Sequence, residues 1–337
     1  MTRSLVVASL LFSTPALARA GEPVVLKLAT LAPSGSMWHQ RLLELGERWS
    51  AISAGQVKLR IFPGGVQGGE GDMLRKLATG QLDAAAVSNV GLHDVTPEPQ
   101  VLSVPQLFES REELGAVFAA IEPRLTSALE RKGLVAIQWS SVGQVRLFCT
   151  GARRTPADLR GARVFAWEGD PASADAWRAT GMRPVVLSSV DLVPSLQTGM
   201  IDCLAHVPVY VLTARLHEKA RAMMDFPWGH VVGATVVTRR AWDRVPAELR
   251  PRLLEAARGL AARIDADAAT ADLDAIAAMR RQGLEVVPVD ARPWLALAEG
   301  SWAALRGPVV PADLLDEVVR LRDRLRQARV AAAPGAR

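Results

Sequence analysis

The residues that most often carry enzyme chemistry are scattered along this chain. Its histidines are His39, His93, His206, His217 and His230. They form no H-x-x-x-H pair and have no Cys-x-x-Cys companion, although zinc sites usually need ligands spaced in this way. The nucleophile motif G-x-S-x-G is missing, and no Ser/His/Asp set stands out from its context. The sequence therefore predicts no catalytic residues, no metal site and no cofactor.

A glycine-rich turn at residues 63–71 lies between a predicted strand, 56–62, and a predicted helix, 72–79. This order resembles a phosphate-binding loop, but neither G-x-G-x-x-G nor a G-K-[ST] ending is present. A nucleotide site is therefore disfavoured. The amino end of a helix at a cleft can still hold a polar or anionic group of another ligand.

Four aspartates recur within a long, alanine-rich helical pattern at residues 246–282. Paired carboxylates can act as general acids and bases, but a charged stripe on a long helix is usually its solvated face. We interpret the stripe in the second way. Its members are Asp265, Asp267, Asp272 and Asp274.

The strands and helices that could position a site are predicted most clearly between residues 154 and 208. Short apolar runs at 162–167, 184–187 and 201–207 alternate with helical segments that end at glycines. This β-α-β-α-β alternation with short connections predicts an α/β fold with a largely parallel sheet. Such sheets bind their ligands at the carboxyl ends of the strands.

The composition is that of a globular protein, because 49% of the 337 residues are hydrophobic and 22% are charged. This length suffices for two domains. Residues 1–20 have the form of a signal peptide, with Arg3, an apolar run at 5–12 and the small-x-small site Ala18-Arg19-Ala20. Removing them lowers the formal net charge from +5 to +3. The remaining charges are dispersed, so we expect an exported protein that does not bind nucleic acid.

Three separated blocks are more specific than this alternation. The first spans residues 61–108, the second reads T-P-A-D-L-R-G-A-R-V from Thr155, and the third reads L-Q-T-G-M-I-D from Leu196. In this order they closely resemble the solute receptors of tripartite ATP-independent periplasmic (TRAP) transporters, the DctP-like family, over roughly residues 25–284. The resemblance implies a two-domain, periplasmic-binding-protein-like α/β receptor with a ligand cleft between the domains. It also implies a periplasmic protein that is not an enzyme, captures a small organic solute and delivers it to integral-membrane subunits.

The domain arrangement of the family suggests residue limits for each part of this chain. We expect the chain to cross between the domains near residues 140–145 and 203–208. The parts are a signal peptide, 1–20; domain I, 21–142 plus roughly 209–250; domain II, 143–208 plus roughly 283–290; a long spine helix across both domains, 246–282; and C-terminal helices with a tail, 291–337.

The resemblance also suggests which residues contact the ligand. Most family members bind small organic acids, and the planar side chain of an arginine can meet a carboxylate through two hydrogen bonds. That arginine ends the family's run D-L-x-G-x-K-I-R, whereas this chain reads D-L-R-G-A-R-V-F, so Phe165 replaces it. The candidate ligand-binding residues are Trp38, Ser88, Asn89, Arg146, Phe165, Trp167, Glu168, His206 and Tyr210.

The replacement leaves three classes of solute open. An apolar or aromatic acid would pair with Arg146 against Phe165, Trp167 and Tyr210. A neutral or cationic solute would use Glu168 as its counter-charge and Trp167 as a cation–π surface. A carboxylate bridged by a metal, as in some family members, would draw on Glu168. Aromatic residues on short strands also pack in cores, which would remove Phe165 and Trp167 from the cleft.

Two further alternatives stay open. Cys149 and Cys203 fall near predicted strands that enter the second domain. Export favours a disulfide between them, whereas two buried free thiols are equally compatible with the sequence. The function is also open in one respect, because a ligand sensor or scaffold of the same fold that no longer serves transport would have the same motifs.

Overall fold

The computed structural model of the protein describes residues 22–168 and 171–332, so the predicted signal peptide lies outside the described residues. The three apolar runs predicted between residues 154 and 208 are all strands. The strands are β1 (Val24–Thr30), β2 (Val57–Phe62), β3 (Ala84–Ser88), β4 (Leu134–Cys149), β5 (Arg163–Trp167), β6 (Arg183–Leu187), β7 (Cys203–His206), β8 (Ala222–Thr238) and β9 (Glu285–Val287). The α-helices are α1 (Met37–Ile52), α2 (Glu70–Thr79), α3 (Arg111–Arg131), α4 (Pro171–Ala179), α5 (Leu192–Gln197), α6 (Pro208–Thr213), α7 (Arg239–Trp242), α8 (Arg250–Arg281), α9 (Ala291–Gly300), α10 (Trp302–Leu305) and α11 (Ala312–Ala332).

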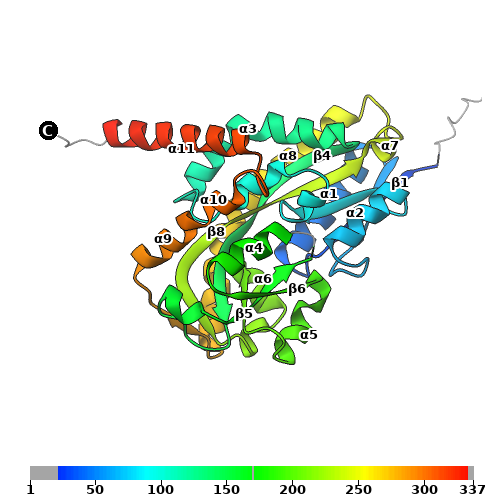
Figure 1. The fold of residues 1–337 in the computed structure, drawn as a ribbon. Helices are drawn as coiled ribbons and strands as arrows, with labels where there is room; N and C mark the ends of the chain where they lie inside the picture. Colours follow the sequence, from blue (N-terminus) through cyan, green and yellow to red (C-terminus); the bar gives the residue numbers. More distant parts are fainter. Residues whose placement is uncertain (1–21, 169–170, 333–337) are drawn as a thin grey trace, which may run out of the picture.

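The strands form one mixed sheet in the order β2-β1-β3-β8-β4-β7-β5-β6, with β9 beside β8. Strand β1 is parallel to β2 and β3, and β5 is parallel to β6 and β7. The sheet is less parallel than expected, because β4 and β8 pair antiparallel along most of their length and run through the whole molecule (Figure 1). These two strands connect the two halves of the sheet. Residues 140–145, where a crossing between the domains is expected, lie within β4, and residues 203–208 comprise β7 and the start of α6.

Two groups of core side chains fill the two halves. In the first half, Leu28 and Leu102 belong to two clusters that include residues of β1, β3, α1, α2 and α3. In the second half, the clusters gather around Cys203 and Leu204. The second-half cluster around Leu204 also contains Val211, Leu216 and Met223. The segment between α6 and the start of β8 thus packs in the second half of the sheet.

The local sequence explains why helix α1 forms. The side chain of Ser36 accepts a hydrogen bond from the backbone N–H of His39 and caps the helix. Leu42, Leu45 and Trp49 then recur on one buried stripe. The indole N–H of Trp49 donates to the carbonyl of Leu253 at 3.0 Å, which joins α1 to the long helix α8.

Helix α8 begins at Arg250, four residues later than expected, and touches both halves of the sheet. Ala257 and Leu260 belong to a first-half core cluster, whereas Met279 belongs to a second-half cluster. This is the spine helix that the resemblance implies. No helix in the described ranges combines the length and the apolar character that crossing a membrane requires.

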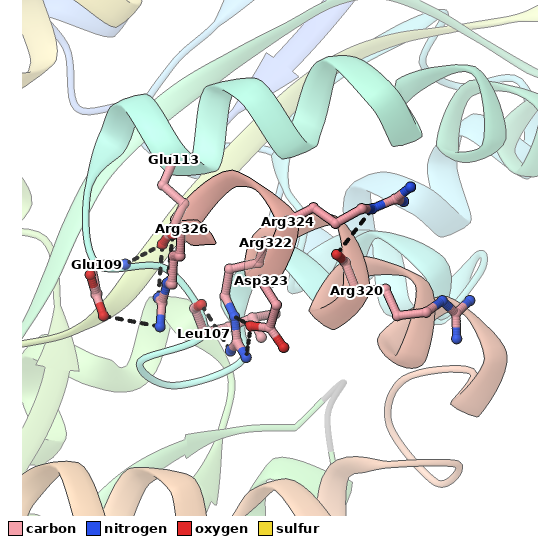
Figure 2. A network of polar contacts seen from close by, with 8 residues as sticks. All are labelled: Leu107, Glu109, Glu113, Arg320, Arg322, Asp323, Arg324 and Arg326. Atoms are coloured by element: carbon pink, nitrogen blue, oxygen red, sulfur yellow. Dashed lines mark hydrogen bonds and ion pairs between the residues drawn. The ribbon is translucent and has the colours of Figure 1, made fainter. Parts of the chain in front are cut away.

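The C-terminal helix α11 lies along α3 (Figure 1). The guanidinium of Arg326 donates to both carboxylate oxygens of Glu113 on α3, at 2.7 and 2.9 Å, and lies 3.0 Å from Glu109 (Figure 2). The side chain of Glu113 is fully buried. Burial alone would raise the pKa of Glu113, but Arg326 and the N–H of Glu109 hold that pKa below its usual value. The helix is thus fixed by a buried charge pair as well as by apolar contacts.

Cys149 and Cys203 form a disulfide, which decides between the two alternatives left open by the sequence. They face one another directly on the neighbouring strands β4 and β7, with their Cα atoms 4.1 Å apart. The bond closes a loop across the second half of the sheet. Both residues are fully buried in its core.

Candidate ligand-binding site

A pocket of about 250 Å³ lies where the two halves of the sheet meet. The first half contributes the turn after β1, the start of α1 and α2, and the end of β3. The second half contributes β5, the start of α5, β7 and α6, and the crossing strands β4 and β8 complete the wall. The lining residues are Thr30, Leu31, Ala32, Pro33, Trp38, Leu42, Glu70, Ala86, Val87, Ser88, Val90, Gln138, Ser140, Val142, Val145, Phe165, Trp167, Ser189, Leu192, Ala205, His206, Val207, Tyr210, Val231, Gly233, Ala234, Thr235 and Ile264.

Aromatic side chains form much of this wall. Trp38 comes from α1, Phe165 and Trp167 come from the same face of β5, and Tyr210 comes from α6. The ring of His206 stacks on the ring of Tyr210, with 4.1 Å between the centroids. Phe165 also packs against the core of the second half. The aromatic wall thus borders both the pocket and the core. Both interpretations made from the sequence, ligand contact and core packing, therefore apply to it.

The two halves touch across the pocket through the glycine-rich turn. A Cβ atom on Gly69 would lie 3.0 Å from the Oγ atom of Ser188, and one on Gly71 would lie 4.0 Å from the ring of Trp167. A Cβ atom on Gly65 would lie 3.4 Å from the side chain of Val190. The glycine-rich turn therefore packs closely against the second half.

Glu70, the first residue of α2, places a carboxylate in the pocket wall. Its Oε1 atom accepts a hydrogen bond from the backbone N–H of Ser88 at 2.6 Å, and its Oε2 atom accepts one from the Ser88 hydroxyl at 2.7 Å. Burial raises the pKa of Glu70, against the lowering effect of these two bonds. Glu70 is 7% exposed and is the one Asp, Glu, Lys or Arg among the lining residues, all of which the structure describes.

His206 and Tyr210 face the pocket as neutral groups. The Nδ1 atom of His206 accepts a hydrogen bond from the N–H of Val207 at 2.9 Å, so the ring proton lies on Nε2. Burial lowers the pKa of His206 to about 4. Burial raises the pKa of Tyr210, and the nearby charge of Glu70 raises it further.

Two buried polar atoms in the wall lack a hydrogen-bond partner within the described residues. They are the indole Nε1 of Trp38 and the Oε1 atom of Gln138. The amide nitrogen of Gln138 is already used, because it donates to the Thr235 hydroxyl at 3.1 Å. A buried polar atom without a partner costs free energy. A solute that offered an acceptor to Trp38 and a donor to Gln138 would recover it.

Six of the nine candidate residues line the pocket, and three do not. Arg146 lies on β4 beside the lining residue Val145, and its guanidinium donates to the side chain of Gln144 at 3.1 Å. Asn89 is fully buried and connects β3 to its surroundings through bonds to Pro99, Ser103 and Val232. Glu168 is exposed at the end of β5. The six lining residues are Trp38, Ser88, Phe165, Trp167, His206 and Tyr210.

Sequence reasoning missed Glu70 and Gln138. A glutamate in the first turn of a helix is usually a capping or dipole-complementing residue, so Glu70 gives no signal of a site. Gln138 lies in an apolar strand, where a single amide signals a buried polar group but not its neighbours.

The aspartate stripe of α8 is not a solvated face throughout, which corrects our interpretation. Asp272 is 7% exposed, and its Oδ2 atom accepts a hydrogen bond from the N–H of Gln144 at 2.9 Å. Asp265 accepts one from the N–H of Ser141, and Asp267 pairs with Arg41 of α1. The stripe therefore ties the spine helix to β4 and α1. Among the described residues, no three His, Cys, Asp or Glu side chains gather as a metal site would require.

Asp272 makes the stability depend on pH. Burial raises the pKa of Asp272 from 3.8 to about 6, against the lowering effect of hydrogen bonds from Gln144 and Val209. Between these values Asp272 binds more protons in the folded state than in the unfolded state, so its contribution to the free energy of unfolding should fall as pH rises from about 4 to 6. Asp272→Asn keeps an accepting oxygen and removes the buried charge. We expect it to raise the free energy of unfolding at pH 8 by about 1–3 kcal/mol.

Urea unfolding at pH 4, 5, 6 and 8 measures this effect. The control is Asp274→Asn, because Asp274 lies on the same helix and is exposed. An Asp272→Asn variant with the wild-type dependence on pH would contradict the prediction.

The fold and the pocket between the halves define a solute-binding receptor, and comparison with known proteins gives its family. Residues 28–305 match the bacterial extracellular solute-binding proteins of family 7, so the chain belongs to this family. The C4-dicarboxylate-binding periplasmic protein DctP of Rhodobacter capsulatus is 24% identical over 254 residues, which are 74% of each chain.

Solved structures of TRAP periplasmic solute-binding proteins share the fold. One from Xanthobacter autotrophicus, with bound β-D-galacturonate, has a TM-score of 0.83 at 18% identity and covers 88% of this chain and 99% of its own. Another from Shewanella oneidensis, with bound succinate, has a TM-score of 0.83 at 20% identity and covers 89% and 99%. The protein is thus a bacterial extracellular solute-binding protein of family 7 with the fold of these structures.

Proposed function

We propose that this receptor binds a small organic solute in the pocket between the halves of its sheet and delivers it to integral-membrane TRAP subunits. The pocket of about 250 Å³, with walls from both halves, is the observation that carries the proposal. Receptors of this kind enclose their ligand between two lobes, with an apolar wall and a few polar groups. The six lining candidates, together with Glu70 and Gln138, are the proposed contacts.

The proposal includes the finer features that the resemblance implies. The protein is exported to the periplasm, its leader is cleaved near Ala20, and two domains close around the solute. Phe165 replaces the arginine that grips a carboxylate in other members, and it leaves an apolar surface in the wall. Galacturonate and succinate, which the relatives bind, are organic acids. Because this chain has Phe165 instead of the arginine that binds a carboxylate, the class of its solute has to be argued separately.

Native mass spectrometry of the mature protein, expressed with export and purified without dialysis, tests the proposal. We expect a bound small molecule that is lost on mild activation, and thermal stabilisation when the identified compound is added back. A hundredfold excess over Kd stabilises by about 2.7 kcal/mol. Trp167→Ala should weaken this binding. A protein that is always empty, or whose bound compound is unaffected by Trp167→Ala, would exclude this pocket as the binding site.

The contact between Gly69 and Ser188 gives a second test, because it exists only in the closed cleft. Gly69→Thr retains a good N-cap residue for α2, and the backbone φ of −70° suits any residue. The added atoms would meet the Ser188 side chain. We expect solute affinity to fall at least about tenfold with little change in the unfolding of the ligand-free protein.

Calorimetric titration measures the affinity of the variant. Ser188→Gly in the Gly69→Thr background removes the obstructing hydroxyl and should restore most of the binding. Equal affinity in wild type and Gly69→Thr would show that the solute binds without this closure.

A further inference from the structure

The charge in the pocket wall is of one sign, negative. Glu70 is buried there, and none of the lining residues is a lysine or arginine. His206 is neutral at physiological pH, because burial lowers its pKa to about 4. Arg163 lies two residues before Phe165 on β5 and forms a two-bond ion pair with Asp202. Burial disfavours the charged form of Glu70 and raises its pKa, so a cation beside this carboxylate would stabilise the charged form.

The chain holds this carboxylate in one place. Both its oxygens are bonded to Ser88, and the Ser88 hydroxyl in turn accepts a hydrogen bond from the N–H of Gly91 at 3.0 Å. A Cβ atom on Gly91 would lie 2.3 Å from Oε2 of Glu70, so only glycine leaves room for the carboxylate. Ser88 and Gly91 therefore fix the position of Glu70 in the wall, as a preorganised binding group requires.

The rest of the wall suits a positive charge. The side chains of Trp38, Phe165, Trp167 and Tyr210 line the same pocket, and aromatic rings can attract a cation to their faces. An anionic solute would instead place a second negative charge near Glu70 in a poorly hydrated space, which is unfavourable. In the position where other family members pair a carboxylate with arginine, this chain has Phe165.

We propose that the solute is an organic cation, an amine or quaternary ammonium compound, whose charged nitrogen is paired with Glu70 and enclosed by the aromatic wall. This inference rests on the proposed function and names the substrate class of the same site. The unpartnered donor of Trp38 and acceptor of Gln138 then bind the polar remainder of the molecule. The counter-charge is thus Glu70 inside the pocket, not the exposed Glu168 that the sequence suggested.

Two sets of compounds of equal shape and different charge test this inference. Choline, 3,3-dimethylbutan-1-ol and 3,3-dimethylbutanoate share a branched head, and butylamine, butan-1-ol and butyrate share a straight chain. We expect calorimetry or thermal-shift titration of the mature protein to show at least one cation binding about tenfold or more tightly than its neutral counterpart. The carboxylates should bind least. A carboxylate that binds more tightly than its matched cation would overturn the inference.

Glu70→Gln and Glu168→Gln assign the counter-charge. Glu70→Gln keeps the shape of the side chain and should reduce cation binding about tenfold, whereas Glu168→Gln should change it less than about twofold. The reverse ranking would move the counter-charge to Glu168 and overturn the assignment. If Glu70→Gln does not fold, the comparison of matched compounds on the wild-type protein still decides the charge of the solute.

Different experimental results would overturn the inference and the proposed function. An acid found in the purified protein, with a loss of binding in Trp167→Ala, would overturn the inference and keep the proposed function. Binding of none of the six compounds would also overturn the inference, and the occupancy measured by native mass spectrometry would then decide the proposed function separately.

Discussion

Replacing both Cys149 and Cys203 by alanine should lower the free energy of unfolding by about 4 kcal/mol. The two residues are 54 positions apart, and a cross-link of this span removes much of the chain entropy of the unfolded state. Because both are fully buried, the smaller alanine side chains add a loss of packing. Chemical denaturation of the oxidised wild type and of the double variant measures the difference.

Reduction supplies the control for this prediction. A reductant should destabilise the wild-type protein by most of the same amount and leave the double variant unchanged. Titration of the unfolded, unreduced wild type should find no reactive thiols. Two reactive thiols would show that the bond does not form in the purified protein.

Arg326→Ala should lower the free energy of unfolding by about 3 kcal/mol. The change leaves the fully buried carboxylate of Glu113 without its charge partner, and the single N–H of Glu109 does not compensate for it. Arg326 is itself partly exposed, which places the expected loss at the lower end for a broken buried pair. Urea unfolding at pH 7 measures it.

Arg324 offers a matched control two residues away on α11. Its guanidinium is exposed and contacts only the carbonyl of Arg320 among the described residues, at 3.3 Å (Figure 2). Arg324→Ala should therefore change the stability by less than about 0.5 kcal/mol. Equal losses in both variants would indicate a general requirement for helix charge rather than the pair with Glu113.

An element of the fold could be predicted from the sequence where its pattern lies within one continuous stretch of residues. The alternation between residues 154 and 208 predicted β5, β6 and β7. The long antiparallel pairing of β4 with β8 could not be predicted, because the two strands are about 90 residues apart and the sequence of neither one indicates its partner. The mixed sheet is the result of that pairing.

The site was predictable only in part, for a related reason. Phe165 and Trp167 emerged because the family's motif runs through them. Glu70 becomes a pocket residue only through Ser88 and Gly91, which lie 18 and 21 positions later. The periodicity of α8 likewise separates a polar face from an apolar one, but it does not show that β4 covers Asp272.

The ladder between β4 and β8 shifts register in four places, one of them between Ser141 and Gly143. Asp265 and Asp272 of α8 bind the backbone on either side of that shift, at Ser141 and Gln144. The irregular part of β4 is therefore anchored to α8 on both sides of the shift. The long helix thus holds the connecting strand at the point where the sheet changes its register.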